Sequence, residues 1–296
     1  MSPVKVGIFG QTNVASTLKY MGILVEELSA YNTEIYFEQN LSESFNGKNK
    51  ESVSGTFSSY HDLDETFELF FSVGGDGTFL RSITFVRDLN IPIIGINTGT
   101  LGFLATIQKE NIPEAIKLLF DKAYIIKERT LLSVSTNDDN EDLKEINFAL
   151  NEISISRKDT PSMITVETYL DDEYLTTYWS DGLIISTPTG STGYSLSCGG
   201  PIITPSSKNI VLTPIAPHSL SVRPLVIPED TRVELKVGSR TNEAILTLDS
   251  RITTINNDTR IYIKKCGFTI KMILLNDQTF IKTLREKLLW GEDTRN

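Results

Sequence analysis

A change of pattern near residue 124 constrains the fold of this 296-residue chain more than any other feature. Before it, short apolar runs typical of buried strands alternate with segments whose apolar residues recur at helical spacing. After it, strand-like runs follow one another without helices between them. The first pattern predicts a parallel sheet with helices on both faces, and the second an antiparallel sandwich or barrel. We therefore expect two domains, which also suits the length.

The first domain is expected to contain four strands and three helices. Apolar residues recur at helical spacing after the first, third and fourth strand-like run. A polar stretch rich in Ser, Asn and Gly, residues 39–59, predicts a long surface loop. The predicted strands are residues 4–9, 33–37, 68–73 and 91–96.

The second domain is expected to consist of short strands joined by turns. The predicted turns are at Asp171-Asp172, Asn256-Asn257 and Gly267. A final helix over residues 279–290 is indicated by the spacing of Phe280 and Leu284. The predicted strands are residues 131–136, 148–156, 164–170, 175–179, 183–187, 210–213, 232–237, 244–248, 261–264 and 268–274.

The charge of the chain argues against one class of function. With 28 Lys+Arg against 38 Asp+Glu the formal charge is −10, whereas a non-specific DNA or RNA binder needs a basic surface. Every apolar run is shorter than the roughly 18 residues of a membrane span, and the N-terminus has no basic leader. Two cysteines, Cys198 and Cys266, are too few for a disulfide framework. We expect a cytoplasmic protein that binds neither nucleic acid nor a membrane.

The run Gly74-Gly75-Asp76-Gly77-Thr78 follows the third predicted strand directly and opens a helix. Backbone N–H groups and the positive end of a helix dipole favour anions at such a point. A carboxylate there repels a phosphate unless a cation or a hydroxyl lies between them. Asp76 is therefore a candidate base or metal partner, and the alternative is that it caps the following helix.

A second segment, residues 181–201, combines small hydroxyl residues with glycines after a predicted strand. Many N–H and O–H donors can converge there on one ligand, and Tyr194 supplies an aromatic face for a base. Neither segment has Lys or Arg between its outer glycines, so phosphate charge must be met by amides, Mg²⁺ or residues such as Arg81. This shortage favours a metal-assisted mechanism.

Four motifs together resemble the NAD kinase family in their order and spacing. They are the glycine run at 74–78, the pair Asn151-Glu152, the segment 181–201 and residues 214–225. The resemblance implies transfer of a phosphoryl group from ATP to the 2′-hydroxyl of the adenosine ribose of NAD, which gives NADP. It also implies a Rossmann-like first domain, an all-β second domain, a divalent cation, expected to be Mg²⁺, and a homodimer or homotetramer.

The resemblance assigns roles to the candidate residues. Asp76, beside Gly77, becomes the proton acceptor for the 2′-hydroxyl, a role that a carboxylate within hydrogen-bond reach can perform. Asn151 and Glu152 hold the adenosine, and Asp181 binds the nicotinamide side. The residues that line the rest of the dinucleotide site are Thr189, Thr192, Gly193, Tyr194, Ser195, Leu196, Ser197 and Ala216.

Asp249 and Arg251 are expected to make the last contacts with the dinucleotide. We place them at alternate positions of one strand, facing the same way. The family often has Asp-Gly-Gln where this chain has Asp249-Ser250-Arg251, so the charge of Arg251 is expected to bias which dinucleotide binds.

The prediction is thus an α/β plus all-β protein. Residues 1–125 form the α/β domain, residues 126–278 form a β-sandwich for NAD binding and oligomerisation, and the final helix packs back on the first domain. Two other functions are compatible with parts of the sequence. A lipid kinase of the diacylglycerol kinase type carries a similar glycine motif, and a non-catalytic dinucleotide sensor would keep the same binding residues. Without the resemblance, Asn151-Glu152 could simply be a polar pair in an edge strand, and Asp181 could simply belong to a hairpin turn.

Overall fold

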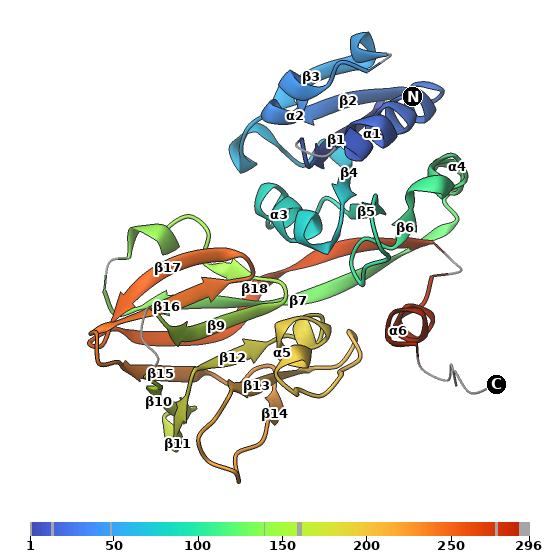
Figure 1. The fold of residues 1–296 in the computed structure, drawn as a ribbon. Helices are drawn as coiled ribbons and strands as arrows, with labels where there is room; N and C mark the ends of the chain where they lie inside the picture. The colour runs from blue at the N-terminus through green and yellow to red at the C-terminus, as the bar shows by residue number, and fades with distance from the viewer. Residues whose placement is uncertain are drawn as a thin grey trace, which may run out of the picture. The chain divides into compact units, whose positions relative to one another are not determined.

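The computed structural model of the chain describes residues 2–12, 15–47, 49–138, 140–158, 162–275 and 278–289. The chain forms two compact units (Figure 1). Unit 1 consists of Met1–Glu128 and Ile270–Asn296, and unit 2 consists of Arg129–Thr269. None of the helices in the described ranges combines the length and apolar character that a bilayer crossing requires.

Unit 1 contains a parallel sheet with the strand order β3-β2-β1-β4-β5, followed by the short β6. From β1 the chain adds β2 and β3 towards one edge of the sheet, and then adds β4 and β5 towards the other edge. Doubly wound sheets bind ligands at the point between these two halves, beyond the carboxyl ends of the strands. The strands are β1 (Val4–Gly10), β2 (Thr33–Glu38), β3 (Val53–Phe57), β4 (Phe67–Gly74), β5 (Ile93–Asn97) and β6 (Ile107–Gln108). The helices are α1 (Ala15–Ser29), α2 (Gln39–Ser44), α3 (Asp76–Val86), α4 (Ile112–Phe120) and α6 (Phe280–Leu288).

Helices cover both faces of this sheet, as the alternation predicted (Figure 1). In β4, Leu69, Phe71 and Val73 belong to the core that α1 and α4 close. The intervening Phe70 points to the other face, where its ring lies 6.4 Å from that of Phe85 in α3. Both faces of a parallel strand are buried in this way, which explains why β4 is apolar along most of its length.

The predicted loop over residues 39–59 is wrong in part. It contains α2, whose first turn is capped by Glu38 through a 3.0 Å bond from the Leu41 N–H. It also contains β3, which pairs in parallel with β2 and buries only Phe57 completely. Because β3 is an edge strand with exposed Ser54 and Thr56, its composition is that of a loop although its backbone is a strand.

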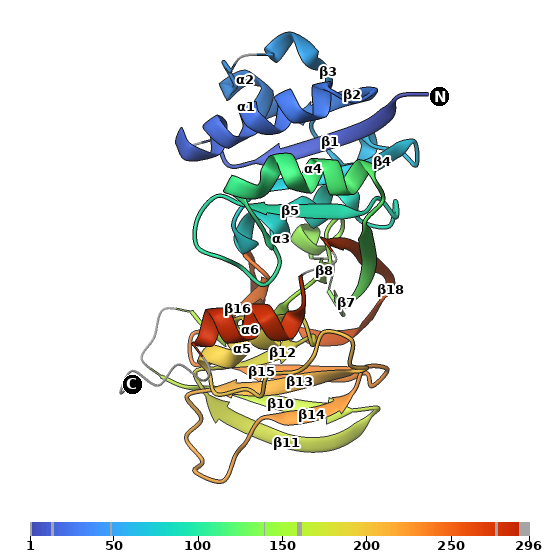
Figure 2. The same cartoon turned by 90° about the vertical axis from the view of Figure 1, so that its right-hand side faces the viewer.

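Unit 2 consists of two antiparallel sheets that share one hydrophobic core, which confirms the predicted sandwich (Figure 2). One sheet has the order β14-β13-β12-β9-β16-β17, and the other contains β11-β10-β15-β18 with β7 and β8. The strands are β7 (Tyr124–Thr136), β8 (Phe148–Ala149), β9 (Glu152–Arg157), β10 (Ile164–Leu170), β11 (Glu173–Ser180), β12 (Gly182–Ser186), β13 (Asn209–Ile215), β14 (Leu225–Pro228), β15 (Val233–Gly238), β16 (Glu243–Leu248), β17 (Arg251–Asn256) and β18 (Arg260–Leu275).

Several predicted strand limits are wrong in informative places. The run 148–156 is divided into β8 and β9 by a break at Leu150 and Asn151. No turn occurs at Gly267, because β18 continues from unit 2 into unit 1, where Met272 pairs with Ile93. Residue 290, at the end of the predicted final helix, lies outside the described residues.

Candidate nucleotide site

The glycine loop ends β4 and begins α3, and it directs a carboxylate to a neighbouring loop. Gly75 is the N-cap of α3, so Asp76 is its first residue and does not cap it. Oδ2 of Asp76 accepts the N–H of Phe103 at 2.8 Å, and Oδ1 accepts those of Leu104 and Ala105 at 3.0 Å. The carboxylate therefore holds three successive amides of the loop that follows β5.

Two residues allow this loop to approach Asp76 so closely. A Cβ at Gly102 would overlap Oδ1 of Asp76, so a glycine is required there. The buried Asn97 donates to the carbonyls of Thr100 and Ala105 at 2.7 and 3.2 Å and accepts the Gly99 N–H at 2.7 Å. The loop is thus fixed at both ends before any ligand binds.

Arg81 lies on α3 and lines a hollow of about 540 Å³ beside the carboxyl end of β1. Its guanidinium carbon is 5.5 Å from the centre of the Phe9 ring. Gly10, Gln11 and Thr12 also line this hollow. The hollow therefore lies near the point between β1 and β4 where the two halves of this sheet meet.

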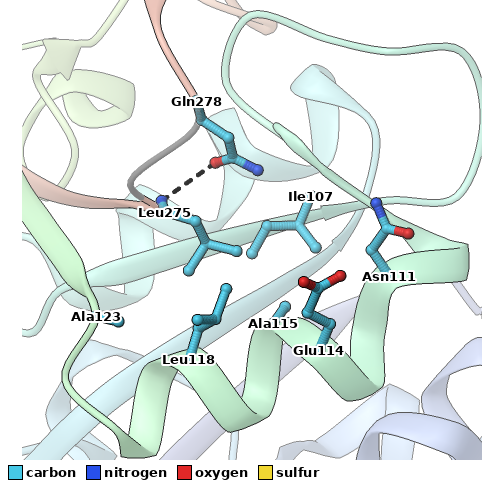
Figure 3. Close-up of a pocket in the computed structure, with 8 residues that line it drawn as sticks. All are labelled: Ile107, Asn111, Glu114, Ala115, Leu118, Ala123, Leu275 and Gln278. Atoms are coloured by element: carbon cyan, nitrogen blue, oxygen red, sulfur yellow. Dashed lines mark hydrogen bonds between the residues drawn. The ribbon is translucent and has the colours of Figure 1, made fainter.

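A second hollow in unit 1, of about 290 Å³, lies against α4 (Figure 3). Glu114 and Leu118 line it on the helix side, and Gln278 closes it opposite, where its Oε1 accepts the Leu275 N–H at 3.4 Å. Gln278 also accepts a hydrogen bond from the Thr106 hydroxyl and donates one to the Thr106 carbonyl. None of the predicted site residues lines this hollow.

In unit 2 the break between β8 and β9 presents Asn151 and Glu152. The Asn151 carbonyl accepts the Thr187 N–H at 2.9 Å and the Ser186 hydroxyl at 3.2 Å. A Cβ at Gly190 would lie 2.6 Å from the Asn151 Cα and would overlap its carbonyl. The turn at 187–190 therefore packs directly on the backbone of the break.

Two acceptor atoms at this break are buried without a hydrogen-bond partner, namely Oδ1 of Asn151 and Oε2 of Glu152. A Cβ at Gly193 would come within 3.2 Å of that Glu152 oxygen, so the glycine keeps the space beside it open. Buried polar atoms are rarely left unpaired in proteins, because each costs about 1–3 kcal/mol. Unpaired amide and carboxyl oxygens on two successive residues are the pattern of a binding site that is completed by hydroxyl or amine donors.

The predicted dinucleotide-lining segment divides into inward and outward residues. Ser195 is completely buried, and its hydroxyl lies 2.8 Å from that of Thr213, so it joins α5 (Tyr194–Ser197) to β13. Thr192 donates to the Thr189 carbonyl at 3.2 Å. The more open residues are Tyr194, which is 45% exposed, Leu196 and Ser197.

Asp181 and Ala216 are brought together at the other end of β12. Gly182 pairs with Ile215 at the end of the β12–β13 ladder, and the Asp181 N–H donates to the Ile215 carbonyl at 2.9 Å, so Asp181 and Ala216 lie just beyond this end. Asp181 forms a 3.1 Å ion pair with Arg157. Ala216 is exposed and has φ +43°, a left-handed conformation that costs energy for a residue with a Cβ.

The expectation that Asp249 and Arg251 occupy alternate positions of one strand is wrong. Asp249 lies in the turn between β16 and β17 with φ +52°. Its side chain is only 2% exposed, and its carboxylate accepts the N–H groups of Leu150, Asn151 and Glu152 at 3.0, 2.8 and 3.2 Å. Arg251 lies 3.7 Å from this carboxylate and donates to the Phe148 carbonyl.

Burial raises the pKa of Glu152 to about 8, and the charge of Asp249 adds to this rise, whereas the Tyr194 N–H opposes it. Because the ordinary value is 4.5, the folded chain binds this proton more tightly than the unfolded chain between about pH 4.5 and 8. The contribution of Glu152 therefore makes the protein less stable as pH rises through this window.

We expect Glu152→Gln to stabilise the protein at high pH, because the amide stays neutral. The gain in the free energy of unfolding should be roughly 2–4 kcal/mol at pH 9 and much smaller at pH 5. Urea unfolding of parent and variant at both pH values measures it. A gain that is equal at pH 5 and pH 9 would contradict the raised pKa.

Within the described ranges, no group of three or more His, Cys, Asp and Glu side chains is arranged to hold a metal ion. Both oxygens of Asp76 already accept amide bonds.

A doubly wound sheet with a glycine loop at its ligand-binding edge, and a sandwich that presents unpaired acceptors beside a glycine-rich turn, define a nucleotide-binding protein. The model of the ATP-NAD kinase N-terminal domain matches residues 6–124, and that of the C-terminal domain matches residues 150–275. The chain belongs to the NAD kinase family.

Individual relatives agree with this membership. The NAD kinase of Christiangramia forsetii is 53% identical over 294 residues, which are 99% of this chain and 100% of the relative. The NAD kinase of Bacteroides fragilis (strain YCH46) is 39% identical over 292 residues, 99% of this chain and 100% of the relative.

Two solved structures share the fold. The crystal structure of an NAD kinase from Archaeoglobus fulgidus in complex with ATP has a TM-score of 0.74 and 25% identity, and covers 97% of this chain and 99% of that one. Yeast NADH kinase complexed with NADH has a TM-score of 0.88 at 24% identity, and covers 99% of this chain and 89% of that one. The second likeness concerns the fold alone.

Sequence reasoning missed several residues that shape the site. Gly102 and Asn97 fix the loop bonded to Asp76, and Gly190 and Thr187 fix the break at Asn151. The signal for the first two was an amide at the end of a buried strand and a glycine in the loop that follows it, which is typical of a loop built for close backbone approach.

Proposed function

We propose that this protein is an NAD kinase that transfers the terminal phosphoryl group of ATP to the 2′-hydroxyl of the adenosine ribose of NAD, giving NADP. Family membership over almost the whole chain supports the reaction. The family also makes the lipid kinase the weaker alternative. The observation that carries the NAD-binding assignment is the pair of buried, unpartnered oxygens on Asn151 and Glu152.

The proposed role of Asn151 and Glu152 is to hold the adenosine. The Glu152 carboxylate accepts ribose hydroxyls, and the Asn151 amide bonds the edge of the base. Tyr194, exposed beside Glu152, offers its ring to the base. Asp181, at the other end of β12, binds the nicotinamide side, and Ala216 closes the dinucleotide site.

Asp76 is the proposed proton acceptor for the 2′-hydroxyl. A carboxylate offers about four lone-pair positions on its two oxygens, and three of them accept N–H groups here. Oδ2, which accepts one bond, retains an acceptor position for a hydroxyl. The loop amides hold the carboxylate in one orientation, as a general base in phosphoryl transfer requires.

Arg81 is the proposed cationic contact for ATP phosphates, and it lines the hollow beside the carboxyl end of β1. Mg²⁺ enters with ATP and supplies charge neutralisation on the phosphate oxygens when bound. We place the enzyme in the cytoplasm, a reducing compartment that suits Cys198 and Cys266, neither of which forms a disulfide.

We further propose a homodimer or homotetramer. Edge strand β17 exposes Ile252 at 69%, and the loop after β13 exposes Leu220 at 92%, apolar groups that a second copy would cover. Light scattering tests this assembly, and a mass of 33.0 kDa, that of one chain, would contradict it.

The test of the function is NADP formation by the purified protein with Mg²⁺, ATP and NAD, read with an NADP-specific dehydrogenase. NADP production supports the proposal. NAD binding without NADP over a range of donors and cations would instead identify a dinucleotide sensor.

We expect NAD to bind more tightly as pH rises. The pKa of Glu152 is about 8 in the folded chain, so only about a tenth of its carboxyls are ionised at pH 7 and about nine tenths at pH 9. If the carboxylate accepts the ribose hydroxyls, the dissociation constant should fall by about tenfold over this range. Calorimetric titration measures it, with Glu152→Gln as the pH-insensitive control. Binding that weakens above pH 8 would exclude the acceptor role.

A further inference from the structure

The carboxylate of Asp249 is buried in a place where a hairpin turn normally exposes one. The turn joins β16 to β17, yet the side chain is 2% exposed and accepts three successive N–H groups from residues 150–152. The Asp249 N–H in turn donates to the Glu152 carbonyl at 3.0 Å. Four hydrogen bonds therefore join one turn to the break between β8 and β9.

The same break is held from its other side. The hydroxyl of Thr187 donates to the Leu150 carbonyl at 2.6 Å, and the Thr187 N–H donates to the Asn151 carbonyl at 2.9 Å. The N–H groups of the break thus donate to the Asp249 carboxylate, and its carbonyls accept hydrogen bonds from Thr187. With its backbone fixed on both sides, the break has little freedom to move the unpaired oxygens of Asn151 and Glu152.

Arg251 completes the arrangement. Its guanidinium lies 3.7 Å from Asp249, donates to the carbonyls of Phe148 and Leu248, and stands 5.4 Å from the centre of the Phe148 ring. A buried carboxylate needs a compensating charge and donors, and Arg251 supplies the charge while it fixes the end of β8.

We propose that Asp249 is a positioning residue that acts through Asn151 and Glu152 by fixing the backbone that carries them, and that Arg251 supports it. The expected effect of Asp249 on NAD binding rests on the proposed function. Its expected effect on the backbone at residues 150–152 does not.

The charges around Glu152 add a measurable consequence of the same contact. Asp249 faces it from the β16–β17 turn, and Tyr194 from α5 donates its N–H to it and carries a phenol within electrostatic reach. Arg251 stands behind Asp249. Removing the charge of Asp249 therefore makes Glu152 ionise at lower pH.

The test compares Asp249→Asn with Asp171→Asn, a matched control. Asp171 also lies in a hairpin turn of unit 2 with positive φ, but its carboxylate accepts only the Arg232 N–H at 2.9 Å on an exposed surface. At pH 9 we expect Asp249→Asn to raise the KM for NAD at least tenfold and to change kcat at saturating NAD less than threefold. Asp171→Asn should leave both near the parent values.

Two further readouts separate positioning from general damage. The midpoint of the pH dependence of KM should move below pH 8 in Asp249→Asn. Adding Asp249→Asn to Glu152→Gln should raise KM by less than the product of the single effects, because one residue acts through the other. An unchanged KM and midpoint, full additivity, or a loss confined to kcat would overturn the proposal.

A ligand-free measurement keeps the proposal distinct from the proposed function. Backbone hydrogen exchange at residues 150–152 should be faster in Asp249→Asn, whereas exchange in the core strands β12 and β16 should match the parent if the unit is folded. Unchanged exchange at residues 150–152 would overturn the positioning role, even if the parent makes no NADP.

Discussion

Asp76→Asn should lower kcat for NADP formation by about 10²–10⁴-fold while NAD still binds. The amide cannot accept the proton of the 2′-hydroxyl. Its NH₂ group also faces backbone N–H groups that the carboxylate accepts in the parent. The measurement is steady-state turnover together with calorimetric NAD binding.

Because Asp76 also holds the loop at residues 103–105, a loss of activity needs a control for loop order. Asn97→Ala removes three bonds that fix the same loop and keeps the carboxylate. We expect it to lower kcat far less than Asp76→Asn does. Equal losses in the two variants would show that Asp76 matters through the loop and would exclude it as the base.

Gly190→Ala should have the second largest effect. The added Cβ would lie 2.6 Å from the Asn151 Cα and closer still to its carbonyl, and backbone atoms cannot move aside as a flexible side chain can. We expect a loss of about 2–4 kcal/mol in the free energy of unfolding and at least a tenfold rise in the KM for NAD.

Gly267→Ala is the matched control for this prediction. It is a glycine of the same unit whose added Cβ would meet nothing within 4 Å, so its stability should equal or slightly exceed that of the parent. Urea unfolding and NAD kinetics on both variants provide the comparison. A Gly190→Ala protein with parental KM would show that the 187–190 turn does not position Asn151.

Much of the fold could be predicted because burial of a strand on one or both faces leaves a recognisable apolar pattern in its sequence. β1, β4 and β5 are mostly apolar, and sandwich strands such as β15 and β16 alternate between buried and half-buried residues. The errors fall on edge strands and on breaks. β3 has too few apolar residues to be recognised, and β18 contains a glycine that usually marks a turn.

The candidate site was predictable at the level of motifs but not of contacts. Glycine runs and the pair Asn151-Glu152 identify where a ligand could bind. The partners of Asp249 are 97 to 99 residues away in the sequence, and nothing local marks its carboxylate as buried. The same holds for Ser195, which resembles its neighbours in sequence but bonds Thr213 inside the sandwich.

The path of the chain through β18 has a consequence for biosynthesis. Unit 1 takes its first 128 residues from the beginning of the chain and its last segment from residue 270 onward, and Met272 of that segment pairs with Ile93. Ribosomes deliver about 5–20 residues per second, so the emerging first segment waits roughly 7–30 seconds for the strand that completes its sheet. During this interval that side of β5 is paired only at Ile96 and Asn97, by β6, so the stretch around Ile93 is an open edge. The nascent chain is exposed there to premature pairing or to chaperones that shield such edges.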